Sequence, residues 1–148
     1  MRTALVTHPI DVAALLGEVA SNECGATTLF VGTVRAVNEG RRVTGIEYSA
    51  YERMAALELE RIAAEATDRF DTTHVVVEHR LGALALGETS VAIAVAHRRR
   101  TPALDASRYI IEELKRRVPV WKREHYVDST REWVDPTRMA QPASLEAT

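Results

Sequence analysis

Lysine is nearly absent from this 148-residue chain, because Lys115 and Lys122 are the only two and every other strongly basic residue is arginine. The two lysines stand on either side of a short apolar stretch that contains Pro119. An ammonium can lose its proton near neutral pH, whereas a guanidinium cannot. Two lysines kept in one short segment therefore indicate proton chemistry there. The alternative interpretation is that a lysine-poor composition spared two neighbours by chance.

Cysteine is equally scarce. Cys24 is the only one, which excludes an internal disulfide and a metal site built from several cysteines. No basic neighbour or helix start favours its thiolate, so we do not expect it to act as a nucleophile. A single cysteine fits a reducing compartment, and we expect the protein to be cytoplasmic.

Long apolar runs and an excess of either charge are also missing. No stretch approaches the roughly 20 apolar residues that cross a bilayer, and no leader-like run opens the chain. The 19 basic and 21 acidic residues give a formal charge of −2, so neither nucleic acid nor a membrane surface is an expected partner. An arginine-rich RNA-binding protein remains a disfavoured alternative, because no basic stripe is interleaved with aromatic residues.

Common cofactor motifs are absent as well. The sequence has no glycine-rich phosphate loop of the Walker or dinucleotide type and no Gly-x-Ser-x-Gly elbow. His8, His74 and His125 lack the spacing of metal ligands. We therefore expect no metal and no nucleotide cofactor.

Hydrophobic residues make up 46% of the chain, enough for one domain with a sizeable core. The spacing of apolar residues predicts a helix capped by Asp11, a longest helix over 51–70, and a helix that starts with Thr101 as N-cap and Pro102 at its first position. Pro119 disfavours helical geometry at Val118, which puts Lys115 on the last turn. Strands are expected at 3–7, 27–35, 43–48, 73–79, 89–97, 121–127 and 131–134, with a loop or small β excursion at 82–87. The runs 73–79 and 89–97 are nearly continuously apolar, so both are expected in the middle of the sheet.

Three groups of cations follow predicted element ends: Arg35, the run His97-Arg98-Arg99-Arg100, and the segment from Lys115 to Lys122. If the strands that end at Arg35 and His97 are neighbours, their cations are expected to share one mouth with Lys115 and to hold a phosphate by converging charge-assisted hydrogen bonds. The equally weighted alternative is that these cations are solvated and complement the helix dipole. We expect His79 to be structural, and the loop 38–42 to form an exposed tip.

Several motifs, in order along the chain, resemble the large, catalytic subunit of molybdopterin synthase, and the likeness covers roughly residues 26 to 134. They are Phe30-Val31-Gly32-Thr33-Val34-Arg35 with Asn38 and Gly40, Glu47-Tyr48, Tyr51-Glu52-Arg53-Met54-Ala55, His79-Arg80-Leu81-Gly82, Gly87-Glu88, Ala96-His97-Arg98, Leu114-Lys115, and Pro119-Val120-Trp121-Lys122-Arg123-Glu124.

The resemblance implies sulfur transfer in molybdenum cofactor biosynthesis. In that family a small ubiquitin-like carrier inserts its Gly-Gly tail, which ends in a thiocarboxylate, and sulfur passes to cyclic pyranopterin monophosphate to form the dithiolene of molybdopterin. The family assembles as a heterotetramer with a homodimer of large subunits at its centre. Carried over by position, Lys115 and Lys122 would be catalytic, and the substrate would be bound by Thr33, Val34, Arg35, His97, Arg98, Arg123 and Glu124.

Our hypothesis gives Lys115 the central role, orienting the thiocarboxylate and exchanging protons while Lys122 assists, because a lysine among other cations and partly buried has a lowered pKa. The alternative function is a non-catalytic module that binds an anion or the carrier. We expect an α+β fold, α/β-hammerhead-like, with a mixed, mainly antiparallel sheet packed against about three helices and a small β subdomain. Residues 1–134 are expected to form one domain, and the tail 135–148, which matches only loosely, is expected to be mobile.

Overall fold

The computed structural model describes residues 1–128 and 130–134, and these form two sheets and three helices. The larger core is built on a four-stranded sheet in the order β1-β5-β7-β2. Its strands are β1 (Arg2–Val6), β5 (Val75–Arg80), β7 (Thr89–His97) and β2 (Ala26–Thr33). Only β1 and β5 run parallel, whereas β7 is antiparallel to both of its neighbours.

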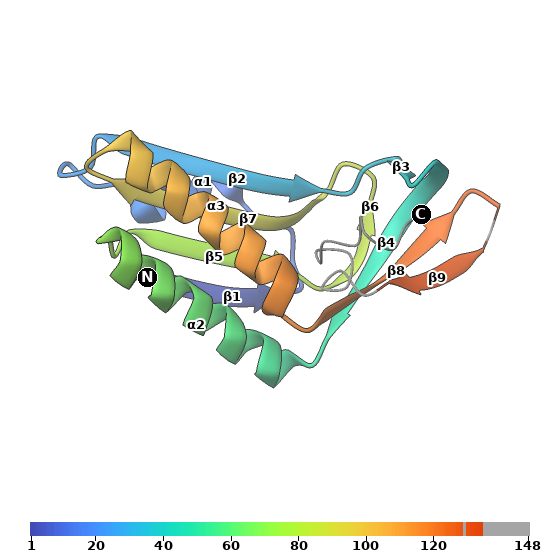
Figure 1. Ribbon diagram of the computed structural model, residues 1–148. Coiled ribbons are helices and arrows are strands. Elements are labelled where there is room, and N and C mark those ends of the chain that lie inside the picture. The colour runs from blue at the N-terminus through green and yellow to red at the C-terminus, as the bar shows by residue number, and fades with distance from the viewer. Residues whose placement is uncertain (129, 135–148) are drawn as a thin grey trace, which may run out of the picture.

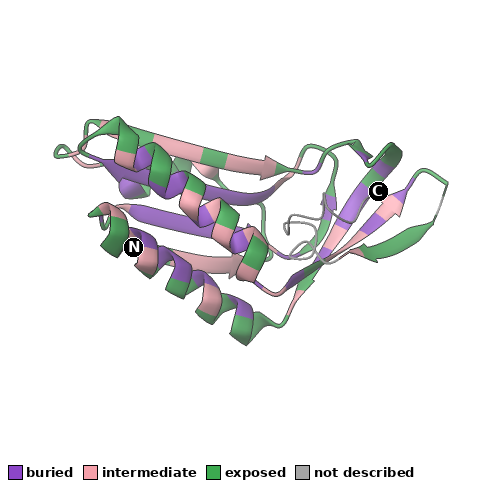
Figure 2. Cartoon of the chain, viewed as in Figure 1, coloured by how far each residue is buried: buried purple, intermediate pink, exposed green. Residues whose placement is uncertain are grey.

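Helices cover both faces of this sheet (Figure 1). Two long helices, α2 (Glu52–Phe70) and α3 (Arg100–Arg117), lie side by side on one face, and the short α1 (Val12–Val19) lies on the other. Alternate residues of the central strands serve the two faces: Val77 and Ile93 pack in the core under α2 and α3, and Val76 and Ala94 pack under α1. This double coverage explains why β5 and β7 are apolar throughout, and Figure 2 shows both as almost wholly buried. The predicted central position of these two strands is confirmed.

A second, five-stranded sheet stands at the end of the molecule where α3 finishes (Figure 1). Its main order is β3-β4-β8-β9, and β6 pairs with β4. The strands are β3 (Val37–Asn38), β4 (Arg41–Ala50), β6 (Gly82–Ala85), β8 (Val120–Tyr126) and β9 (Arg131–Val134). All its pairings are antiparallel. The predicted α+β class, mixed and mainly antiparallel with three helices, is confirmed.

The ends of two helices follow from local chemistry. The Asp11 carboxylate accepts a hydrogen bond from the Ala14 amide and so caps α1, as expected. Val118, before Pro119, is extended, so α3 ends at Arg117 and Lys115 lies on its last turn, also as expected. The predicted start of α3 is wrong, because its N-cap is Arg99 rather than Thr101.

The segment 38–42 is a tight hairpin whose residues 39–42 are exposed, as expected of a tip, whereas Asn38 is buried. Asn38 pairs with Arg41, and only Glu39 and Gly40 form the turn, both with positive φ (49° and 79°). Two positive φ values suit the twist of a two-residue hairpin, and glycine takes one of them without strain. Asn38 is 7% exposed, so it faces into the molecule.

No helix of the described part of the chain is long and apolar enough to cross a membrane. The predicted mobility of the tail 135–148 falls outside the described residues.

Candidate active site

A pocket of about 280 Å³ lies where the two sheets meet the end of α3. It brings together residues from six elements and from the segment after β2. Its lining includes Lys115 from α3, Lys122 and Glu124 from β8, and Thr33 and Arg35 at the end of β2. The remaining lining residues are Phe30, Gly32, Asn38, Val43, Ile46, Tyr48, Ser90 and Val91.

Lys115 and Lys122 meet because the chain turns directly from α3 into β8. Pro119 stops the helix, and β8 begins one residue later. Side chains alternate along a strand, so Lys122, Glu124 and Tyr126 share the face that looks toward the pocket. The antiparallel register places Lys122 opposite Tyr48 of β4, which also lines the pocket. The expectation that both lysines share one cavity with Arg35 is confirmed.

The two lysines have different electrostatic surroundings. Lys122 Nζ lies 3.0 Å from Oε1 of Glu124, a carboxylate that is fully buried. Lys115 is half-buried and makes no ion pair within the described residues. Burial, together with the positive charge of Lys122, lowers the pKa of Lys115. Lys115 therefore loses its proton more readily than an exposed lysine does, and Lys122 is the lysine with a carboxylate partner.

His79 sits near Lys115 in the wall behind the pocket. Its imidazole is 2% exposed, packs edge-on against Tyr48 at a centroid distance of 5.2 Å, and makes a 3.0 Å hydrogen bond from Nδ1 to the Arg80 carbonyl. Burial and the charge of Lys115 lower the pKa of His79 to about 4. His79 is therefore neutral at physiological pH and gives Lys115 no opposite charge.

Replacing Lys122 by methionine is expected to raise the pKa of Lys115, because one of the two causes of its depression is removed. Burial remains, so the value should stay below that of an exposed lysine. Because the chain has only two lysines, protein labelled with ¹³Cε-lysine gives two lysine signals, and a pH titration by NMR reads Lys115 directly. An unchanged or lower pKa in Lys122→Met would contradict the electrostatic coupling.

Glu124 is the most buried charged group of the pocket. Its carboxylate accepts hydrogen bonds from Tyr126 Oη (2.6 Å) and from Asn38 Nδ2 (2.7 and 2.9 Å to its two oxygens). Burial by itself would raise the pKa of Glu124, but these hydrogen bonds and the charge of Lys122 outweigh burial and hold the pKa below its usual value. Glu124 thus remains an anion inside the protein.

Two residues expected to bind substrate face elsewhere. Arg123 precedes Glu124 on β8 and points to the other face of the strand, where its guanidinium pairs with Glu47 at 2.7 Å and lies over the Trp133 ring. Val34 is 3% exposed and belongs to the main core. Neither lines the pocket. The period-two alternation of β8 could have placed Arg123 correctly from the sequence.

His97 and Arg98 also lie away from the pocket of their own chain. The strands that end at Arg35 and His97 are neighbours, as supposed, but they run antiparallel, so Ala26 rather than Thr33 pairs with His97. Their ends are therefore at opposite edges of the sheet. His97 is buried and its Nδ1 accepts the Arg99 amide at 3.0 Å, whereas Arg98 is exposed beside Asp71. The prediction that all these cations line one pocket is therefore wrong within one chain.

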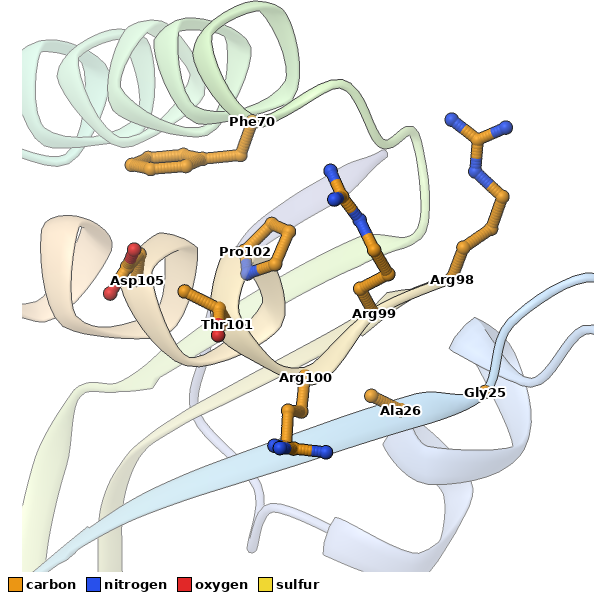
Figure 3. A pocket seen from close by; sticks show the side chains of 9 residues that line it. All are labelled: Gly25, Ala26, Phe70, Arg98, Arg99, Arg100, Thr101, Pro102 and Asp105. Atoms are coloured by element: carbon orange, nitrogen blue, oxygen red, sulfur yellow. The ribbon is translucent and has the colours of Figure 1, made fainter.

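The arginines after His97 border a larger cleft, of about 680 Å³, at the start of α3. Figure 3 shows Arg98, Arg99 and Arg100 pointing in different directions around it. Their guanidinium groups do not converge on one point as an anion cradle requires. The smaller pocket with the two lysines is therefore the better candidate for chemistry.

Within residues 1–128 and 130–134, no group of three or more histidine, cysteine, aspartate or glutamate side chains could hold a metal ion. Sequence reasoning missed several contributors to the pocket, above all Asn38, Tyr48 and Ser90. The family motifs contained Asn38 and Tyr48 but gave neither residue a role in the pocket, and no motif contained Ser90.

Comparison with known families shows which family the chain belongs to. The model of the family described as "MoaE protein" matches residues 5–117. The chain belongs to the MoaE family. The molybdopterin synthase catalytic subunit of Pyrococcus abyssi is 38% identical over 139 residues, which cover 93% of each chain. The chain spans about two fifths (39%) of the length of the Drosophila willistoni relative it matches.

Solved structures show the same MoaE-family fold. The molybdopterin synthase from Staphylococcus aureus superposes with a TM-score of 0.83 and 32% identity, covering 88% of this chain and 94% of that one. A protein–protein complex of subunits 1 and 2 of the molybdopterin-converting factor from Helicobacter pylori superposes with a TM-score of 0.71 and 25% identity, covering 89% of each chain.

Proposed function

We propose that this chain is the catalytic subunit of a molybdopterin synthase. It transfers sulfur from the C-terminal thiocarboxylate of a small ubiquitin-like carrier to cyclic pyranopterin monophosphate, forming the dithiolene of molybdopterin. The observation that carries the proposal is the meeting of Lys115, Lys122 and Arg35 in one pocket of a protein whose overall charge is close to neutral. Both reactants are anions, so a local group of cations is the electrostatics that this reaction needs.

Lys115 acts at the reacting sulfur. As an ammonium it holds the thiocarboxylate, and with its lowered pKa it exchanges a proton as the new carbon–sulfur bond forms. Two carriers react in succession, and each forms one carbon–sulfur bond. The carbon–oxygen bond that each sulfur replaces breaks, at one carbon with opening of the cyclic phosphate and at the other with loss of water. Water then releases each carrier as a carboxylate when its acyl–sulfur bond breaks. The Lys122 ammonium, paired with Glu124 at 3.0 Å, lies in the same pocket and stabilises the negative charge that develops there. The sulfur arrives on the carrier, so the chemistry makes no demand on Cys24.

Arg35 binds the phosphate of the substrate. Arg35 is exposed at the pocket mouth, and Nη2 donates a 3.1 Å hydrogen bond to Asn38 Oδ1, its one side-chain partner among residues 1–128 and 130–134. The other guanidinium donors can bind phosphate oxygens in a fork geometry. Thr33, at the end of β2, is exposed beside it and offers a hydroxyl.

The pocket of one chain is small for such reactants, because small-molecule sites usually measure about 300–1,000 Å³. A carrier tail and a second copy of the chain would complete it. β2 is an edge strand, and edge strands pair readily with another chain. Antiparallel pairing of two β2 strands across a two-fold axis would set the Ala26 end of one copy beside the Thr33 end of the other. Arg98 of the second copy follows His97, the register partner of Ala26, and would then approach the Lys115 pocket.

Mixing two inactive variants tests this arrangement. Lys115→Ala and Arg98→Ala should each be impaired alone, but reassembled mixed dimers should regain activity at about a quarter of all sites, because one site per mixed dimer has both residues intact. Lys122→Ala mixed with Lys115→Ala is the matched control, since those two residues line the same pocket and cannot complement. Activity no higher in the first mixture than in the second would exclude a shared site and return Arg98 to a surface role.

The function itself is tested by mixing the purified protein with a thiocarboxylated carrier and the cyclic pterin, and measuring the dithiolene product. Product formation supports the proposal. Carrier binding without product would favour the alternative of a non-catalytic carrier-binding module. The proposal includes a heterotetramer with two large subunits at its centre, supported by the two-subunit Helicobacter pylori complex, and a cytoplasmic location, supported by the single cysteine.

A further inference from the structure

Asn38 stands between an arginine and a carboxylate of the pocket. Its Oδ1 accepts from Arg35 Nη2 at 3.1 Å, and its Nδ2 donates to both oxygens of Glu124 at 2.7 and 2.9 Å. A guanidinium can only donate and a carboxylate can only accept, so this orientation of the amide is the one that satisfies both neighbours. The Asn38 side chain therefore links a cation to an anion while remaining neutral.

The carboxylate on the far side of Asn38 is held from three directions. Glu124 accepts hydrogen bonds from Asn38 Nδ2 and Tyr126 Oη, and it forms an ion pair with Lys122 Nζ. Tyr126 is itself fixed, because the Arg41 guanidinium lies over its ring at 3.4 Å. The hydrogen bond to Glu124 raises the pKa of Tyr126 to about 12, so its hydroxyl stays a donor. With these bonds made, Glu124 has little capacity left to bind substrate, in contrast to the role expected from the sequence.

The backbone around Asn38 is also well fixed. Asn38 ends β3 in a two-residue hairpin, where it pairs with Arg41. Arg41 in turn bonds Glu132 and Thr130 across the second sheet. The Asn38 side chain therefore projects from a short hairpin whose backbone and Arg41 side chain are held by hydrogen bonds.

We propose that Asn38 is a positioning residue that keeps Arg35 and Glu124 apart while holding both at the pocket. Without a neutral spacer, the Arg35 guanidinium could swing onto the Glu124 carboxylate and form a direct ion pair. Arg35 would then be withdrawn from the substrate phosphate, and Glu124 would be shared between two cations instead of serving Lys122. This inference rests on the proposed function for its kinetic consequences, but the contacts themselves can be tested without turnover.

Kinetics of Asn38→Leu provide the first test. Leucine is close to asparagine in size but can neither accept from Arg35 nor donate to Glu124. We expect kcat/KM for the pterin to fall about 10- to 100-fold, as for the loss of hydrogen bonds to charged groups, with most of the change in KM. Asn38→Asp should be similarly impaired, because it accepts from Arg35 but sets a second carboxylate against Glu124. Arg42→Ala, an exposed residue of the same hairpin, is the control and should keep full activity.

A double-mutant cycle separates positioning from simple loss of structure. If Asn38 acts through Arg35, then Asn38→Leu should add almost nothing to the loss already caused by Arg35→Gln. The ¹³Cε signal of Lys122 gives a second reading that needs no substrate. In Asn38→Leu it should move toward the position that it takes in Glu124→Gln, since both changes weaken the same ion pair.

These outcomes distinguish the inference from the proposed function. If the wild-type protein forms no product, the proposed function fails. The Lys122 signal still shows whether Asn38 keeps Arg35 away from Glu124. The positioning role is overturned if Asn38→Leu leaves the Lys122 signal in place, or if its kinetic loss adds fully to that of Arg35→Gln. A lowered melting temperature with neither signature would make Asn38 a purely structural residue of the hairpin.

Discussion

Lys115→Ala is expected to lower the rate of dithiolene formation by about 10²- to 10⁴-fold, the range typical for loss of a general acid–base group. The loss also removes the ammonium that holds the thiocarboxylate, so the upper part of that range is expected. The fold should survive, because Lys115 is half-buried on the last turn of α3 and its charge has no partner within the described residues. Single-turnover product formation with excess carrier measures the effect, and circular dichroism checks the fold.

Lys115→Arg is the informative control for this prediction. Arginine keeps the positive charge and much of the length, but it cannot lose its proton near neutral pH. If proton exchange is the essential property, Lys115→Arg should still bind the carrier and yet remain nearly as slow as Lys115→Ala. A Lys115→Arg protein with wild-type turnover would show that only charge matters at this position.

Glu124→Gln is expected to lower the free energy of unfolding by about 3 kcal/mol, the lower part of the range for breaking a buried ion pair. The carboxylate is fully buried, and its loss leaves the Lys122 ammonium without its counter-ion. The new amide group of glutamine would also face Asn38 Nδ2, which is itself a donor. Lys122 is 16% exposed, which lets water recover part of the cost. Urea denaturation at neutral pH measures the difference.

The pH dependence of this difference has a definite sign. The pKa of Glu124 is lower in the folded protein than its ordinary value, so its contribution to stability is fully present above the ordinary value and is lost as pH falls through the folded one. The gap between wild type and Glu124→Gln should therefore shrink in acid. Glu132→Gln, opposite Glu124 in the register but exposed, should change stability by less than about 0.5 kcal/mol. A constant gap at all pH values would mean that the charge of Glu124 contributes nothing.

Local rules predicted most of the elements. Pro119 ends α3, and this residue alone predicts that Lys115 lies on the last turn and Lys122 just beyond it. The apolar runs of β5 and β7 predicted central strands, because only strands covered on both faces can be apolar throughout. These inferences depend on neighbouring residues alone.

Long-range geometry was harder to predict. Whether β2 and β7 run parallel or antiparallel is not encoded in either strand, and that direction decides whether His97 lies near Arg35 or at the opposite edge. Asn38 faces inward because it bonds Glu124, 86 residues away, so its neighbours in the sequence do not predict its burial, although 39–42 are exposed as expected. Arg123 is different, since strand alternation was sufficient to turn it away from Lys122.

In the proposed sulfur transfer, Lys115, with its lowered pKa, exchanges a proton at the reacting sulfur. The pH profile of single-turnover product formation, set beside the NMR titration of Lys115 in the same protein, tests it most directly. We expect the rate to change with an apparent pKa that matches that of Lys115 and lies below the ordinary lysine value. A rate that stays constant through the titration of Lys115 would contradict the account.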